Sequence, residues 1–133
     1  MPDNAGLLRK LIRLALIAAC LAEGLLILVL ALAGNAQPSG NFLSLGWDKA
    51  NHFAAYLLFT ATSRLAFPKI PIPVMIFCLI LFGSAIELLQ PLWGRELNPL
   101  DLLANAAGIA AGLALIESLR FLKPKEACAD REN

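Results

Sequence analysis

Four stretches of the chain are dominated by apolar residues, and short polar or proline-rich segments separate them. The stretches cover residues 14–33, 49–67, 74–90 and 99–122. Each is close to the roughly 20 residues that a helix needs to cross the hydrocarbon of a bilayer. The pattern predicts an all-α integral membrane four-helix bundle with short loops. Residues 1–133 would form a single membrane domain that ends in a flexible tail over residues 123–133.

Proline and asparagine residues indicate where the later helices begin. Pro68 and Pro71 lie between the second and third stretches and predict a tight turn there. Before the fourth stretch, Asn98 is expected to be the N-cap and Pro99 the first helical residue. Asp101 would then stand at the third helical position, as in a capping box, which gives it a purely structural alternative role.

The first stretch has an alternative interpretation as a signal peptide, because Ala31-Leu32-Ala33 resembles a cleavage site. Its apolar region is longer than the usual 7–15 residues, which favours a membrane span. Glu23 interrupts this stretch, and the sequence places no cation at its depth. We therefore expect Glu23 to be either protonated or hydrogen-bonded to the interior of the bundle.

Composition agrees with a membrane protein. The chain has 133 residues, of which 59% are hydrophobic, and a mean hydropathy of +0.70. Such a chain is too apolar for an ordinary soluble domain of this size. The net charge is +1, and no cluster of Lys and Arg is left over for a nucleic-acid interface. The three cysteines form no CxxC motif, so neither a disulfide framework nor a zinc site is indicated, and no cofactor is expected.

Basic residues are distributed unevenly between the two sides that four spans would create. The side that receives both termini and the turn near residue 68 holds nine of them: Arg9, Lys10, Arg13, Arg64, Lys69, Arg120, Lys123, Lys125 and Arg131. The other side holds only Lys49 and Arg95. The positive-inside rule then predicts that both termini are cytoplasmic. Trp47 and Trp93 would lie at the outer boundary, where indole rings are favoured.

Small residues in the fourth stretch predict close helix packing. Gly108 and Gly112 are four positions apart, with Asn105 on much the same face. We interpret this pair as a contact inside the bundle rather than as a homodimer interface. Glu117 stands three residues before Arg120, a spacing that predicts an ion pair at the cytoplasmic end.

The polar residues of three spans are expected to meet at one depth. Asp48, His52 and Tyr56 are four residues apart and share one helix face. At a rise of 1.5 Å per residue, His52 would lie roughly 6 Å below the outer start of its helix, and Asn105 roughly 10 Å below the start of the fourth. Glu87 lies about one turn below the outer end of the third stretch. The sequence therefore predicts a polar site near the outer membrane surface.

These residues resemble the pattern of the VanZ-like family of membrane proteins, and the similarity runs from about residue 47 to residue 112. Its pieces are Asp48-Lys49-x-x-His52-x-x-x-Tyr56, Glu87-x-x-Gln90, Arg95 and Asp101-x-x-x-Asn105-x-x-Gly108. The resemblance implies a small multi-pass protein of the bacterial cytoplasmic (inner) membrane. The family is named for a protein associated with low-level resistance to the glycopeptide teicoplanin in bacteria, so the resemblance also implies a link to that resistance.

The favoured hypothesis is a protein that binds or processes an anionic, amphiphilic cell-envelope molecule at the outer leaflet. The candidate catalytic residues are His52, Glu87, Asp48 and Asp101, with His52 as general acid or base. The candidate substrate-binding residues are Lys49, Tyr56, Gln90, Arg95 and Asn105, among which the two cations would hold a phosphate or carboxylate. The expected partner is a membrane lipid or a lipid-linked envelope precursor.

Three alternatives remain open from the sequence. The first is a non-catalytic membrane adaptor, in which the polar residues only tie helices together and a membrane protein is the partner. The second is a metal site built from Asp48, His52, Glu87 and Asp101, although no two of these ligands show a strong spacing signature. The third is a proton-coupled carrier, which ranks last because few polar groups lie between Glu23 and the cytoplasmic side.

Overall fold

The structure, a computed structural model, describes residues 4–33, 48–94 and 97–122, with the side chain of residue 48 excepted. Its helices are α1 (Asn4–Leu32), α2 (Asp48–Ala66), α3 (Ile72–Leu89), the short 3-10 helix η2 (Gln90–Trp93) and α4 (Pro99–Leu122). Within these residues every regular element is a helix, which confirms the predicted all-α class.

Most helix boundaries lie within two residues of the predicted ones. α4 spans residues 99–122 as expected, and α3 begins at Ile72, directly after Pro71. α1 is the exception, because it begins at Asn4 rather than at residue 14. Its first turns contain Arg9 and Lys10, which are good helix formers. The basic segment before residue 14 is therefore part of the helix rather than a separate segment before it. The loop expected over residues 34–46 and the tail over 123–133 lie outside the described residues.

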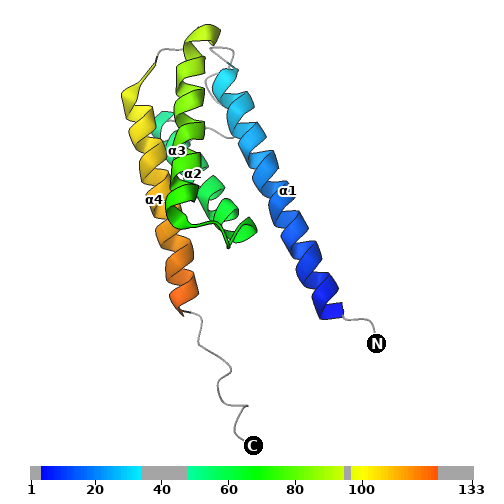
Figure 1. Ribbon diagram of the computed structural model, residues 1–133. Coiled ribbons are helices and arrows are strands. Elements are labelled where there is room, and N and C mark those ends of the chain that lie inside the picture. The colour runs from blue at the N-terminus through cyan, green and yellow to red at the C-terminus, as the bar shows by residue number, and fades with distance from the viewer. Residues whose placement is uncertain (1–3, 34–47, 95–96, 123–133) are drawn as a thin grey trace, which may run out of the picture.

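Successive helices run in opposite directions, so that the start of α1 and the end of α4 lie at the same end of the bundle (Figure 1). α2 makes its largest contact with α4 and a smaller one with α1. α3 packs on α4 and, less closely, on α1. α1 is the least covered helix, and Cys20 is its one buried residue. This antiparallel order puts the start of α2, the end of α3 and the start of α4 at the end opposite the termini.

The contact between α2 and α4 is close because glycine faces the backbone of α2. A Cβ atom on Gly108 would overlap the carbonyl oxygen of Phe53 and lie 3.0 Å from the amide nitrogen of Leu57. A Cβ atom on Gly112 would lie 2.6 Å from the carbonyl oxygen of Leu57 and 2.9 Å from Cβ of Thr60. The prediction that these two glycines pack inside the bundle is therefore confirmed.

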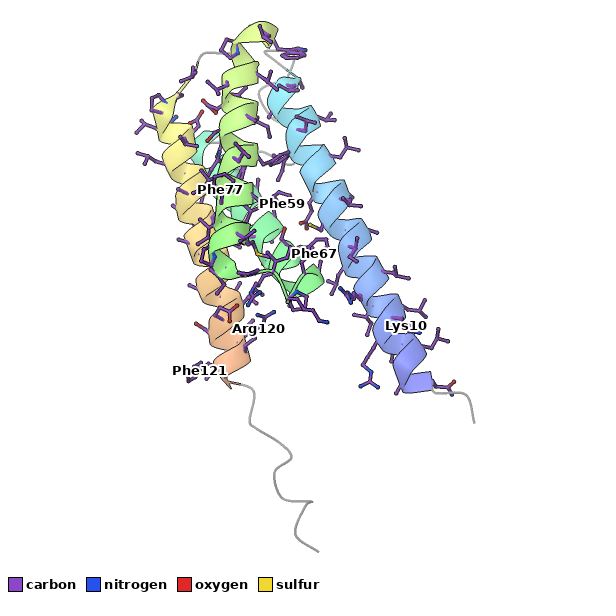
Figure 2. The ribbon with its side chains drawn as sticks, in the orientation of Figure 1. Lys10, Phe59, Phe67, Phe77, Arg120 and Phe121 are labelled. Atoms are coloured by element: carbon purple, nitrogen blue, oxygen red, sulfur yellow. The ribbon has the colours of Figure 1, made fainter. Side chains whose placement is uncertain are left out.

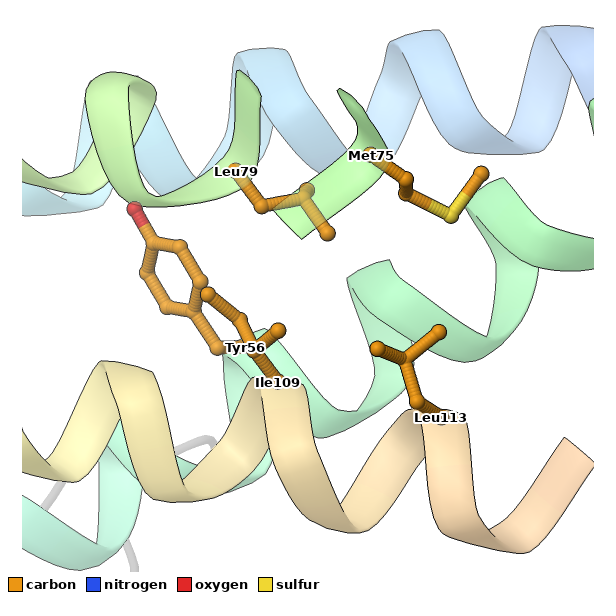
Figure 3. Close-up of a cluster of buried hydrophobic side chains, with 5 residues drawn as sticks. All are labelled: Tyr56, Met75, Leu79, Ile109 and Leu113. Atoms are coloured by element: carbon orange, nitrogen blue, oxygen red, sulfur yellow. The ribbon is translucent and has the colours of Figure 1, made fainter. Parts of the chain in front are cut away.

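The apolar core lies where α2, α3 and α4 meet, and it adjoins the polar residues that the sequence pattern singled out. It consists of Tyr56, Met75, Leu79, Ile109 and Leu113 (Figure 3). In Figure 3 the Tyr56 ring extends from α2 past Ile109, and its hydroxyl group reaches the ribbon of α3. Tyr56 thus joins the apolar core to the polar end of the bundle.

Three of the four long helices, α1, α3 with η2, and α4, are long and apolar enough to cross a membrane. Large apolar side chains cover their outer surfaces, and Leu21, Phe77 and Leu103 are each more than 60% exposed. Such a surface matches a hydrocarbon solvent rather than water. α2 has 19 residues but falls short on composition, because polar side chains at Lys49, His52 and several later positions lower its hydropathy.

Candidate functional site

A carboxylate on α4 joins two nitrogen-bearing side chains of α2. Lys49 Nζ donates a hydrogen bond of 3.1 Å to Oδ1 of Asp101, whose side chain is only 4% exposed. The other oxygen, Oδ2, lies 3.7 Å from Nε2 of His52. That separation is within ion-pair range when the imidazole carries a charge. The predicted convergence of His52 and Asp101 at one end of the bundle is confirmed by this geometry.

Asn105 binds the second nitrogen of His52. Nδ1 of His52 lies 3.0 Å from Oδ1 of Asn105, one turn along α4 from Asp101. Because an amide oxygen can only accept, this contact requires a ring form of His52 that has a proton on Nδ1. Both ring nitrogens of His52 therefore face side chains of α4, and the imidazole is only 14% exposed. The predicted match in depth between His52 and Asn105 is correct, and the contact links α2 to α4.

Glu87 performs the capping role that the sequence suggested for Asp101. The amide nitrogen of Asn98 donates a 2.8 Å hydrogen bond to Oε1 of Glu87. Asn98 is the N-cap as predicted, since its Oδ1 accepts a 3.1 Å bond from the amide of Leu100. The side chain of Asp101 binds Lys49 instead of reaching back to the cap, so the capping-box interpretation of Asp101 is wrong. Glu87 of α3 thus accepts the hydrogen bond from the N-cap amide that a capping box would assign to Asp101.

Three buried polar atoms near these contacts have no hydrogen-bond partner among the described residues. They are Oε2 of Glu87, Oε1 of Gln90 and the hydroxyl of Tyr56. Gln90 is 1% exposed, and its Nε2 donates a long 3.5 Å bond to the backbone carbonyl of Ala31 in α1. An unsatisfied buried polar group costs about 1–3 kcal/mol. These atoms therefore retain hydrogen-bonding capacity that water or a ligand can use.

Tyr56 and Asn105 converge on a glycine of α3. A Cβ atom on Gly83 would lie 2.8 Å from the Tyr56 hydroxyl and 3.1 Å from Nδ2 of Asn105. Glu87 follows Gly83 by one helical turn, so its carboxylate lies on the same face of α3. We call the set formed by these side chains the polar cluster: Lys49, His52, Tyr56, Glu87, Gln90, Asp101 and Asn105.

Two of the predicted site residues cannot be placed in the polar cluster. Arg95 lies outside the described residues, and so does the side chain of Asp48. The predicted roles of Asp48 in catalysis or capping and of Arg95 in anion binding stay predictions. Trp93, expected at the outer membrane boundary, is 49% exposed at the end of η2.

A second polar group lies at the end that contains the termini, and the sequence revealed only part of it. Nε of Arg64 donates a 2.7 Å bond to Glu117, and its Nη1 donates to the carbonyl oxygens of Pro68 and Ile70. Arg120 also donates to Glu117, at 3.0 Å, which confirms the predicted pair. Arg64 is 8% exposed and fixes the α2–α3 turn to α4. Its position four residues before Pro68 is a signal for the contact with the turn alone, and no spacing signal indicates the pairing with Glu117.

Polar side chains continue along α2 between these two groups. Thr62 donates a 3.1 Å bond to Oε1 of Glu23, in agreement with the alternative that Glu23 is hydrogen-bonded inside the bundle. Ser63 and Cys20 lie 3.3 Å apart across the α1–α2 interface. Thr60 is completely buried, and its hydroxyl has no partner among the described residues. The polar face of α2 thus points into the protein rather than into lipid.

The described residues contain no group of three or more His, Cys, Asp or Glu side chains arranged to hold a metal ion. Asp101 already accepts from Lys49, and Glu87 already accepts from the N-cap of α4. The metal-site alternative therefore gains no support from the part of the chain that the structure describes.

Comparison with known proteins adds no assignment. No protein-family model matches the chain, and neither a curated protein nor a solved structure does. Functional inference therefore depends on the residues and their geometry.

Proposed function

We propose that the chain is a multi-pass protein of the bacterial cytoplasmic membrane, similar to the VanZ-like family, whose polar cluster binds the head group of an amphiphilic cell-envelope molecule. The observation that carries this proposal is the collection of seven polar side chains from α2, α3, η2 and α4 at one end of an apolar bundle. Polar side chains at membrane depth are costly and usually functional. Three atoms of the cluster also retain unused hydrogen-bonding capacity.

The distribution of charge supports an outer-leaflet position for the polar cluster. The end that carries the termini contains several cations of the described chain: Arg9, Lys10, Arg13, Lys69 and Arg120. By the positive-inside rule this end faces the cytoplasm. The polar cluster at the opposite end then lies under the outer surface, where envelope precursors and glycopeptide antibiotics meet.

The contacts within the cluster favour binding over catalysis. His52 directs both ring nitrogens at α4, so a general-base role would require it to release Asn105 or Asp101. Lys49 is 23% exposed and remains accessible to an anionic group. The unsatisfied oxygens of Glu87 and Gln90 accept from N–H or O–H donors. These features suit a head group that combines an acidic group with hydrogen-bond donors, as lipid-linked precursors do.

The test is teicoplanin susceptibility of a bacterium that depends on the protein for its resistance. Lys49→Ala is expected to remove the protection while the protein still accumulates in the membrane. Lys69→Ala is the matched control, since it removes one exposed cation at the other end of the bundle. Equal protection by both variants would contradict the proposal. Lipid that copurifies with the wild-type protein, and not with Lys49→Ala, would identify the ligand by mass spectrometry.

The second candidate is a membrane adaptor whose polar cluster only ties helices together. It is favoured by the pairing of Lys49 with Asp101 and of His52 with Asn105, which leaves the α2–α4 contact largely self-contained. The exchange Lys49→Asp with Asp101→Lys distinguishes the two candidates. The exchange keeps an ion pair between α2 and α4, so an adaptor should keep its function. A head-group site should lose its function, because the cation has moved from α2 to α4.

A further inference from the structure

A hollow that is open to its surroundings, called the cavity below, lies at the end that carries the termini and is lined by one face of α1 alone. Its volume is about 330 Å³, and the lining residues are Lys10, Arg13, Leu14 and Ile17. Their spacing of three, four and seven residues places them on a single helix face. The two basic side chains lie nearer the N-terminus, and two aliphatic side chains follow one turn deeper. The lining is mainly apolar, because Lys10 and Arg13 contribute mostly their aliphatic stems and keep their charged groups at the rim.

The same face of α1, farther along the helix, is the one that contacts α2. Gly24 approaches the Phe59 ring, and Cys20 lies 3.3 Å from Ser63. Ile17, Arg13 and Lys10 continue this row toward the N-terminus at spacings of three and four residues. The cavity thus lies where the α1–α2 contact face continues beyond its partner.

The contact stops because α2 and α3 are short. α2 ends at Ala66, less than one turn after Ser63, and the chain turns back into α3. α1 continues from Cys20 to Asn4, which is roughly 24 Å further at 1.5 Å per residue. Figure 1 shows α1 and α4 extending past the α2–α3 turn, and Figure 2 places Lys10 on that extension of α1. α2 therefore does not cover the face of α1 that lines the cavity.

Helix length places the two cations at the level of lipid head groups. From Leu14 to Leu32, α1 is about 28 Å long, close to the roughly 30 Å thickness of the hydrocarbon region. Lys10 and Arg13 then lie at the phosphate level, while Leu14 and Ile17 lie at the level of the first acyl carbons. A soluble anion would use the cations alone, whereas a lipid uses both parts of the cavity.

Local charge favours an anionic lipid. Glu117 is the one acidic residue at this end among the described residues. Its carboxylate is already bonded to Arg64 and Arg120. Those contacts hold Glu117 on the α2–α4 side of the bundle, away from Lys10 and Arg13 on α1. The cavity cations therefore remain available to a negative charge.

We infer that this cavity is a binding site for one anionic phospholipid of the leaflet on the side of the termini, with its phosphate on Lys10 and Arg13 and an acyl chain along Leu14 and Ile17. The site is separate from the polar cluster at the opposite end. It does not depend on what the polar cluster binds.

The test measures binding of phosphatidylglycerol and of phosphatidylethanolamine to the purified full chain in detergent, by native mass spectrometry. Wild-type protein is expected to retain phosphatidylglycerol preferentially. The double variant Lys10→Gln/Arg13→Gln should lose about fivefold in affinity per cation, from about 1 kcal/mol for each basic residue near an anionic surface. Arg9→Gln is the matched control, because it removes a neighbouring exposed cation that does not line the cavity. Ile17→Trp fills the cavity with every charge retained and should also weaken binding.

Several outcomes overturn the inference. An equal loss for Arg9→Gln would mean that the basic surface attracts lipid without a specific site. Equal retention of the two lipids by the wild-type protein would remove the charge argument. Full displacement of phosphatidylglycerol by inorganic phosphate would identify a free-anion site instead. Unchanged binding in Ile17→Trp would exclude the cavity, and this variant decides the matter if the double variant does not fold.

Discussion

The substitution Gly108→Ala tests the closest helix contact of the bundle and, through it, the polar cluster. The added methyl group would overlap the carbonyl oxygen of Phe53 and lie 3.0 Å from the backbone nitrogen of Leu57. Backbone atoms cannot rotate away as a side chain can. The methyl group therefore fits only if α2 and α4 move apart by a large fraction of an ångström.

Two opposing contributions set the size of the effect. Replacing glycine by alanine inside a helix gains about 1 kcal/mol of helix propensity. Overpacking typically costs about 1–3 kcal/mol, and a gap of 0.5–1 Å forfeits about a quarter to a half of the dispersion energy of each contact. Because the α2–α4 interface is the largest in the bundle, we expect the cost to prevail. The net loss of stability should be up to about 2 kcal/mol.

The assay is thermal unfolding of the purified protein in detergent, followed by circular dichroism. Gly108→Ala is expected to lower the unfolding midpoint by roughly 5 °C. Gly24→Ala is the matched control, because its methyl group would meet only the movable edge of the Phe59 ring, at 3.3 Å. Its midpoint should stay equal to that of the wild type or rise. A Gly108→Ala midpoint at or above the wild-type value would refute the close α2–α4 contact.

Substitutions at three further sites address single polar groups, each measured by the same unfolding assay. Thr60→Val replaces a fully buried hydroxyl that has no partner among the described residues, so its midpoint should stay equal or rise, and a fall would reveal a hydrogen bond or bound water. Arg64→Lys should cost about 2 kcal/mol, because an ammonium cannot reproduce the planar set of bonds to Glu117 and to two carbonyl oxygens of the α2–α3 turn. Glu87→Gln retains an acceptor for the amide of Asn98 and should be tolerated, whereas Glu87→Leu should cost about 1–2 kcal/mol, and equal midpoints would deny the capping role.

The helices and the depth of the polar cluster could be predicted because they depend on local signals. Long apolar runs set the helix count, and Asn98-Pro99 set the start of α4. Because a helix rises 1.5 Å per residue, counting from each start was enough to bring His52 and Asn105 to one level.

The individual partners could not be predicted, because they depend on how each helix is rotated about its axis. That rotation is fixed by Gly108 and Gly112 against the backbone of α2, a contact between distant segments. It directs Asp101 at Lys49 and leaves the α4 cap to Glu87. The same contact brings Arg64 of α2 to Glu117 of α4, a pairing that sequence spacing does not indicate.

The position of α2 also constrains how the polar cluster can bind a ligand. α2 is the least apolar long helix, and its polar face is satisfied mainly by α1 and α4. A ligand that takes a nitrogen of His52 must displace Asn105 or Asp101 and thereby weaken the α2–α4 contact. A ligand held by Gln90, Glu87 and a Lys49 N–H that Asp101 does not use leaves that contact intact. Binding of the second kind should therefore slow amide hydrogen exchange in the first turns of α2, and faster exchange there on binding would show that His52 itself is engaged.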